Sequence, residues 1–181
     1  MEDGVELAPV VESSRLRLRP PMMDDAEAIF TQYAQDAEVT TYLLWRPHET
    51  IETVRDFLRR CLAACEQGTT VPWAITRTSD GRLLGMIELR LEASRAELGY
   101  VLARPFWGQG YATEAVRAVV DLALAHPAIY RVWAVCDLEN HASARVLEKA
   151  GMQREGVLRR WSLHPNISDV PRDCLCYATV K

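Results

Sequence analysis

The chain has 181 residues, of which 49% are hydrophobic and 25% charged, and its formal net charge at pH 7 is −4. These values are typical of one globular domain, which we expect over residues 1–181. Because the chain has no excess of basic residues, nucleic-acid or anionic-membrane binding is not expected. No apolar run reaches the roughly 18 residues of a membrane span, and the acidic N-terminus is unlike a secretory signal. We therefore expect a cytoplasmic protein.

Five cysteines and four histidines show no spacing typical of a disulfide framework or a metal site. Cys61 and Cys65 stand four apart in a helical pattern, and Cys174 and Cys176 share one face of a predicted strand. We expect the cysteines to be buried small hydrophobic residues, and we expect no metal cofactor.

The predicted elements begin after a polar segment, residues 1–13, which we expect to be a flexible tail. Residues 15–19 alternate as a strand does, and the pair Asp24 and Glu27 has the pattern of a capping box that opens a helix. A loop over residues 42–45 follows. A long amphipathic helix is then predicted from Ile51 onward.

Between residues 71 and 103 the hydrophobic period becomes two, which predicts three antiparallel strands. A mostly apolar helix is predicted from Gln109 to Ala125, and a strand over residues 131–135 follows it. Asn140 then caps a helix that Gly151 ends, before two final strands. This order predicts an α/β fold with a mixed, mostly antiparallel sheet flanked by about four helices. The exposed edges of the last strands would allow a homodimer.

The segment from Arg104 to Ala115, RPFWGQGYATEA, leads from a strand through a glycine-containing loop directly into a helix. Gly108 and Gly110 remove side chains where backbone amides have to approach a ligand closely. These amides and the positive end of the helix dipole predict an anion site suited to a diphosphate. A P-loop would need Gly-Lys-Ser/Thr, which the chain lacks, and a dinucleotide fingerprint would need glycine at Thr113.

The string ELGYVLARPFWGQGYATEA, followed by RVWAVCDLENHASARVLEKAGMQREGVLRR, resembles the GNAT N-acetyltransferase superfamily. Within it, the chain is most similar to the Rim-type (RimJ/RimL-like) N-terminal acetyltransferases of ribosomal proteins. The resemblance extends from RLRLRP to RDCLCYATV and is densest between Glu97 and Gly156. It implies a GNAT fold, acetyl-CoA as cosubstrate, and a strand before the glycine loop that carries a bulge and splays from its neighbour.

The resemblance also implies where coenzyme A binds. Its pantetheine arm would pair with the exposed backbone of Val101, Leu102 and Ala103. Its diphosphate would lie on the amides of the glycine loop, which are those of Trp107, Gly108, Gln109, Gly110, Tyr111 and Ala112. One position departs from the superfamily pattern, because Pro105 stands where the pattern has Gln or Arg, with Arg104 one step earlier.

The helix that begins after Asn140 carries the second part of the resemblance. Many superfamily members have, at the position of Leu147, a tyrosine that protonates the departing thiolate. The resemblance to the Rim-type branch implies instead that Asn140 holds the pantetheine arm and that Ser143 is the acid. The residues alone also allow Asn140 to be a simple N-cap and Ser143 an ordinary first-turn serine.

An incoming ammonium group must lose a proton before it attacks, and Glu97 is the predicted general base, with Glu88 as second choice. A backbone amide near Val101 is expected to stabilise the oxyanion. Cys136 lies in this region, but no Cys-His-acid arrangement supports a covalent acyl-enzyme. We therefore expect direct transfer.

The expected activity is N-acetyl transfer from acetyl-CoA to a primary amine, favouring the α-amine of a protein or peptide N-terminus. The acceptor pocket is expected between the loop over residues 42–46 and the late loop over residues 161–170. Two alternatives remain open. The acceptor could be a small amine such as an amino acid, a polyamine or an aminoglycoside, or the chain could be a non-catalytic acyl-CoA-binding module.

Overall fold

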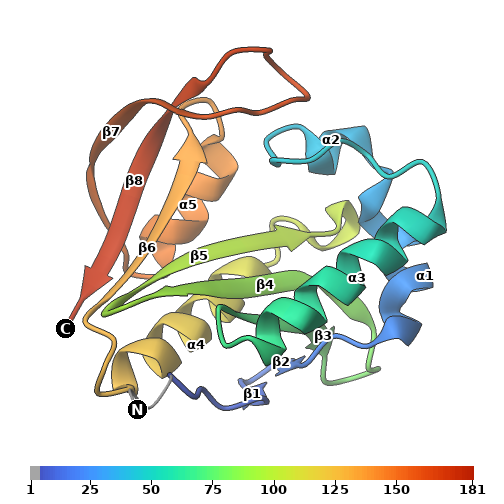
Figure 1. The fold of residues 1–181 in the computed structure, drawn as a ribbon, viewed down its shortest axis with the longest axis horizontal. Coiled ribbons are helices and arrows are strands. Elements are labelled where there is room, and N and C mark those ends of the chain that lie inside the picture. Colours follow the sequence, from blue (N-terminus) through green and yellow to red (C-terminus); the bar gives the residue numbers. More distant parts are fainter. Residues whose placement is uncertain (1–4) are drawn as a thin grey trace.

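The computed structural model describes residues 5–181, which form one eight-stranded sheet with helices on both faces (Figure 1). The strand order is β1-β2-β3-β4-β5-β6-β8-β7. The strands are β1 (Val11–Glu12), β2 (Leu16–Arg19), β3 (Thr70–Arg77), β4 (Leu83–Glu92), β5 (Arg95–Leu102), β6 (Arg131–Asp137), β7 (Gln153–Ser162) and β8 (Arg172–Val180). The helices are α1 (Ala26–Ile29), α2 (Ala37–Thr40), α3 (Ile51–Glu66), α4 (Tyr111–Ala125) and α5 (His141–Lys149).

The predicted mixed, mostly antiparallel sheet is confirmed, because β5 and β6 form the one parallel pair among the described strands. Their pairing covers only three residue pairs and ends at Glu97–Trp133. Beyond that point β5 stays paired with β4 as far as Leu102, while β6 stays paired with β8 as far as Asp137. The two central strands therefore diverge, as expected (Figure 1).

Strand β5 lacks the bulge that the resemblance implied. Its register with β4 is unbroken from Glu92–Arg95 to Gly85–Leu102. Strands β4 and β5 lie so close together here that position 85 requires glycine, because a Cβ atom there would lie 2.1 Å from the carbonyl oxygen of Val101. The central strands thus separate without a bulge in β5, since each one follows its own antiparallel neighbour.

Helix α3 covers one face of the sheet, and α4 and α5 cover the other (Figure 1). Val54, Leu58 and Cys61 of α3 are buried at the predicted helical spacing. Helix α4 is more apolar and buries one broad face, formed by Tyr111, Ala115, Val116, Val119, Val120 and Ala123. The central strands β4 and β5 are therefore covered by helices on both faces of the sheet.

The N-terminal segment differs from the expected tail over residues 1–13. Residues 1–4 lie outside the described residues, but Leu7 is buried. Val11 and Glu12 pair with Leu18 and Arg17 and so add β1 to the edge of the sheet. A strand of two residues is too short to show an alternating pattern, so β1 could not be predicted from the sequence.

The helical segment after β2 also begins differently. It starts with a 3₁₀ turn at Met23–Asp25 and passes through α1 into a π turn at Phe30–Ala34. The carboxylate at its N-terminus belongs to Asp25, which accepts hydrogen bonds from the Met22 amide (2.8 Å) and from both ends of the Arg19 guanidinium (2.8 and 2.6 Å). The predicted capping pair of Asp24 and Glu27 is therefore wrong, because the charge-assisted bonds from Arg19 fix Asp25 instead.

Helix α2 is a fifth helix beyond the four or so expected. Its four residues are too few to show a helical period, and the Asp36 carboxylate caps it by accepting from the Glu38 amide (2.9 Å). Over residues 5–181, no helix is long and apolar enough to cross a lipid bilayer. All five cysteines are free, and four are buried as expected, whereas Cys65 is exposed.

Candidate active site

Two cavities meet where β5 and β6 diverge. The larger cavity, of about 800 Å³, lies between the glycine loop and α5. The smaller cavity, of about 370 Å³, lies between the 42–45 loop and the central strands. The residues that line both cavities are Tyr42, Leu43, Tyr100, Val101, Asn140 and Ser143. This shared lining lets a molecule in one cavity touch a molecule in the other.

The glycine loop presents a row of open backbone amides to the larger cavity. Gly108 and Gly110 have positive φ angles of 73° and 81°, and Gly110 is the N-cap of α4. Within the described residues no protein acceptor is recorded for the amides of residues 108–113, whereas the Trp107 amide is bonded to the carbonyl of Arg104 (3.1 Å). The predicted anion site is therefore one residue shorter than expected at its start, and it coincides with the positive end of a 15-residue helix.

Arg15, at the start of β2, braces this loop from outside. Its guanidinium lies 4.5 Å from the centre of the Tyr111 ring, donates to the carbonyl of Gln109 (3.0 Å) and pairs with Glu114 (2.7 Å). Burial alone would raise the pKa of Glu114, but hydrogen bonds from Ser13 and Arg15 hold it below its ordinary value. The arginine thus offsets the one acidic side chain in the first turn of α4.

Replacing Arg15 with Gln is expected to raise the Kd for coenzyme A about five-fold, since an unbraced loop must be ordered on binding. Calorimetric titration would measure this change. Arg17→Gln is the matched control, because Arg17 is exposed and its one ion pair among residues 5–181, with Glu12, is 4.0 Å long. Equal affinities in the two variants would contradict a bracing role.

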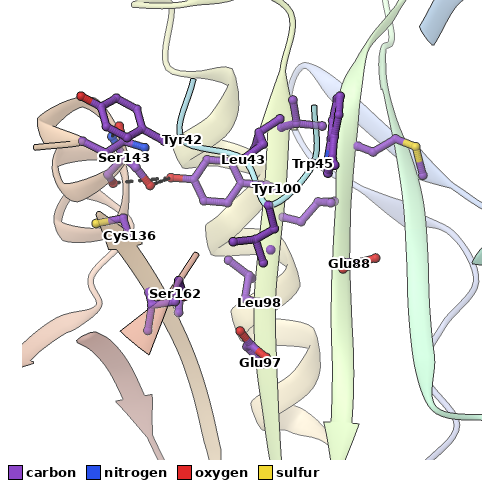
Figure 2. A pocket seen from close by; sticks show the side chains of 18 of the residues that line it. Tyr42, Leu43, Trp45, Glu88, Glu97, Leu98, Tyr100, Cys136, Ser143 and Ser162 are labelled. Carbon is purple, nitrogen blue, oxygen red and sulfur yellow. Dashed lines mark hydrogen bonds between the residues drawn. The ribbon is translucent and has the colours of Figure 1, made fainter. Parts of the chain in front are cut away.

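The start of α5 places Ser143 between the two cavities (Figure 2). The side-chain oxygen Oδ1 of Asn140 accepts from the Ser143 amide (3.1 Å), so the predicted N-cap is confirmed. The Ser143 hydroxyl lies 2.7 Å from the phenol of Tyr100, which extends from β5 toward α5 (Figure 2). Ser143 therefore has its backbone and its side chain held by different partners.

The backbone of β5 alternates between β4 and the gap. The Ala103 amide donates to the carbonyl of Leu84 (2.8 Å), and the register is unbroken. Because backbone groups alternate along an antiparallel ladder, the Val101 amide also faces β4, while the amides of Tyr100 and Leu102 face the gap. The Val101 amide therefore does not face the gap where the oxyanion was expected. Ala103 is fully buried and lines neither cavity.

The smaller cavity contains a cluster of three charged side chains. Arg90 donates to Glu88 (3.0 Å) and to Glu97 (3.1 Å). Burial raises the pKa of Glu97, although the Arg90 charge opposes the shift. Glu97 and Tyr100 are three residues apart on β5, so their side chains point to opposite faces of the sheet. Both predicted catalytic residues, Glu97 and Ser143, thus line one cavity but approach it from different faces.

A buried ion pair fixes the turn that leads from β6 into α5. The Asp137 side chain is fully buried and accepts from Arg172 at 2.6 and 3.1 Å and from the Glu139 amide at 2.9 Å. Burial by itself would raise the pKa of Asp137, but these hydrogen bonds hold it below its ordinary value. The buried His164 ring lies 3.7 Å away.

Two loops close the smaller cavity, as the sequence predicted. Tyr42, Leu43, Leu44 and Trp45 line it from one side, and Ser162 and His164 from the other. Asn166 joins them by donating to the carbonyls of Thr40 (2.7 Å) and Trp45 (2.8 Å). Trp161 packs against Trp133 instead and does not line this cavity.

Several residues of the site were missed from the sequence. Tyr100 follows Gly99 in a strand whose pattern shows only alternation. Arg145 and Lys149 line the larger cavity, and neither forms an ion pair within the described residues; their i, i+4 spacing after Ser143 could have pointed to a phosphate-facing side. Arg104, which stands one step before the departure at Pro105, pairs with Asp36 (3.1 Å) and Glu38 (2.8 Å).

Known proteins are similar to this chain in sequence and in fold. Residues 15–153 match the family described as "Acetyltransferase (GNAT) domain". The uncharacterized N-acetyltransferase YoaA of Bacillus subtilis is 34% identical over 176 residues, which cover 96% of this chain and 97% of that protein. A GNAT-family acetyltransferase from Bacillus anthracis superposes with a TM-score of 0.82 at 27% identity, covering 94% and 98% of the two chains.

A more distant fold neighbour is RimL, the ribosomal L7/L12 α-N-protein acetyltransferase in complex with coenzyme A. Its TM-score is 0.84 at 20% identity, and the match covers 94% of this chain and 97% of that one. The open amides, the diverging strands and the matched sequence agree on one kind of protein. This chain belongs to the GNAT family and is an acetyl-CoA-dependent N-acetyltransferase.

Proposed function

We propose that this enzyme acetylates the α-amine at the N-terminus of a protein or peptide. The observation that carries the proposal is the charge of the smaller cavity, whose carboxylate and guanidinium side chains are those of Glu88, Arg90 and Glu97. When all three are ionised, they leave one negative charge. That charge suits a single ammonium group, whereas a polyamine brings several.

The remaining lining of the smaller cavity supports a peptide as the acceptor. It is mostly apolar and aromatic, with Tyr42, Trp45, Phe57 and Met86 around the charged cluster. Such walls suit the neutral first residues of a polypeptide. RimL, which shares the fold, is an α-N-protein acetyltransferase of ribosomal L7/L12.

The chemistry of the amine also favours an N-terminus. Deprotonating an α-amine with a pKa near 8 costs roughly 1.4 kcal/mol at pH 7, whereas a lysine near 10.4 costs roughly 4.6 kcal/mol. A carboxylate that is already paired with Arg90 is a modest base and suits the easier acceptor.

In this proposal each residue has one role. The amides of residues 108–112 bind the diphosphate of coenzyme A, and the open side of β5 with Asn140 holds the pantetheine arm. Glu97 takes the amine proton, the Tyr100 or Leu102 amide donates to the oxyanion, and Ser143 donates to the departing sulfur. Burial raises the pKa of the Cys136 thiol to about 11, so it stays protonated near pH 7, which supports direct transfer.

The test compares acceptors at equal concentration by release of free thiol from acetyl-CoA. A peptide with a free N-terminus and no lysine should be acetylated, and mass spectrometry should place the acetyl group on its α-amine. The same peptide blocked at its N-terminus and carrying one lysine is the matched control and should react at least tenfold more slowly. Faster turnover with spermidine, free amino acids or an aminoglycoside would overturn the proposal in favour of a small-amine substrate.

Replacing Glu97 with Gln should remove the acidic limb of the pH profile. A base works only when deprotonated, so wild-type kcat/KM is expected to fall as the pH drops through the pKa of Glu97, which burial raises. The variant should lose about 10- to 100-fold at pH 7 and vary less with pH. Glu88→Gln is the control, because it removes the other Arg90 partner and should keep the limb. A limb that persists in Glu97→Gln would exclude Glu97 as the base.

A further inference from the structure

We infer that Tyr100 is a positioning residue for this reaction, holding the Ser143 hydroxyl so that its proton points at the departing sulfur. The inference rests on the proposed role of Ser143. The structural observation behind it is the 2.7 Å contact between the two hydroxyl oxygens, at the point where the two cavities meet (Figure 2).

When two hydroxyl groups lie 2.7 Å apart, one donates its proton to the oxygen of the other, and the phenol is the better donor. A phenol is far more acidic than an aliphatic hydroxyl, so Tyr100 donates to the Ser143 oxygen. The Ser143 proton is then excluded from this bond and remains available. The other recorded acceptor for the Tyr100 hydroxyl is the Ser143 carbonyl at 3.4 Å, which is much longer.

Without Tyr100, the Ser143 hydroxyl could donate its proton to a backbone carbonyl instead. A serine inside a helix commonly turns its hydroxyl back to a carbonyl of the preceding turn. Here the Ser143 amide is already satisfied by Asn140, and the hydroxyl oxygen is held from the side of β5. The phenol therefore selects the rotamer that faces the gap.

Tyr100 keeps its own proton throughout. Burial raises the pKa of its phenol above the ordinary value, so the phenolate is disfavoured. When the amine lone pair forms the new N–C bond, the C–S bond breaks and its electron pair goes to sulfur. Ser143 passes its proton to that sulfur. The ammonium group sheds two protons in all: Glu97 takes the first before the attack and releases it to water, and the second, lost after the N–C bond forms, restores Ser143 through water. No proton is gained or lost by the protein over one turnover.

The test is a double-mutant cycle with Tyr100→Phe and Ser143→Ala, measured as kcat and as KM for acetyl-CoA. Tyr100→Phe keeps the ring and removes only the hydroxyl, and it should lower kcat about tenfold, the value of one hydrogen bond of roughly 1.4 kcal/mol. KM should stay within about twofold. In the Ser143→Ala background, Tyr100→Phe should have almost no further effect, because the group it orients is already gone.

Tyr177→Phe is the matched control, since this buried phenol donates to Glu148 (2.8 Å) and lines neither cavity. It should leave kcat unchanged. If Tyr100→Phe has full kcat while Ser143→Ala is slow, the positioning role is wrong and the proposed acid stands. A multiplicative loss in the double variant, or a loss seen in KM, would show that Tyr100 only shapes the strand. A Ser143→Ala enzyme with full kcat would overturn the acid and the inference together.

Discussion

Replacing Arg172 with Met is expected to lower the free energy of unfolding by about 3–5 kcal/mol, because it leaves the fully buried Asp137 carboxylate without its charged partner. Methionine keeps much of the side-chain volume, so the loss reports the charge rather than a cavity. Urea unfolding followed by circular dichroism would measure it. Since Asp137 opens the turn into α5, activity should fall as well.

Arg131→Met is the matched control for this loss. Arg131 also lies on a strand and pairs with one carboxylate, that of Glu155, but the two side chains are 31% and 43% exposed. Its removal should cost about 0–1 kcal/mol. Equal losses in the two variants would contradict the account of a buried pair.

The loss in Arg172→Met should shrink as the pH falls. In the wild type the pKa of Asp137 is lowered, so the pair adds stability above the unfolded-state pKa and loses it as the pH falls through the folded-state pKa. In the variant the unpaired carboxylate should protonate more readily, which relieves the buried charge. A difference that stays constant down to pH 3 would argue against this explanation.

Replacing Ser143 with Ala is expected to lower kcat about 100-fold, the lower end of the effect of a positioned acid. The Kd for coenzyme A should change less than threefold, because the substitution leaves the glycine loop, the proposed diphosphate site, untouched. Stopped-flow thiol release and calorimetric titration would separate the two quantities. Ser94→Ala is a suitable control, since Ser94 is exposed in the turn between β4 and β5 and should have no effect.

A kcat within threefold of wild type would remove Ser143 from the chemistry. It would also favour departure of the sulfur as a free thiolate. A large increase in the Kd for coenzyme A with unchanged kcat would instead assign Ser143 to binding.

Most elements could be predicted from the sequence because their signals are local. The period of two over β3 to β5, the apolar face of α3 and the Asn140 cap of α5 each depend on neighbours within a few residues. The two-residue β1 and the four-residue α2 were missed because they are shorter than any period. The capping pair was misplaced because Arg19, six residues before Asp25, fixes that carboxylate.

In the candidate site, too, the features that depend on local sequence could be predicted, and those that depend on strand pairing could not. A glycine loop before a helix predicts open amides, since the first turn of any helix lacks acceptors for them, and residues 108–113 bear this out. The direction of the β5 amides could not be predicted, because it depends on which residues pair with β4. The register assigns Val101 to β4 and leaves Tyr100 and Leu102 facing the gap.

The sequence by itself determined the order of the longer elements, the glycine loop before α4 and the family, because spacing along one segment carries each of these. Only the tertiary structure decided which side chains meet. Tyr100 and Ser143 are 43 residues apart, and Asp137 and Arg172 are 35 apart. Such pairs form because two antiparallel half-sheets share only three residue pairs and then separate, which brings α5 to the opening. The pairing of distant strands sets that geometry, and no local pattern records it.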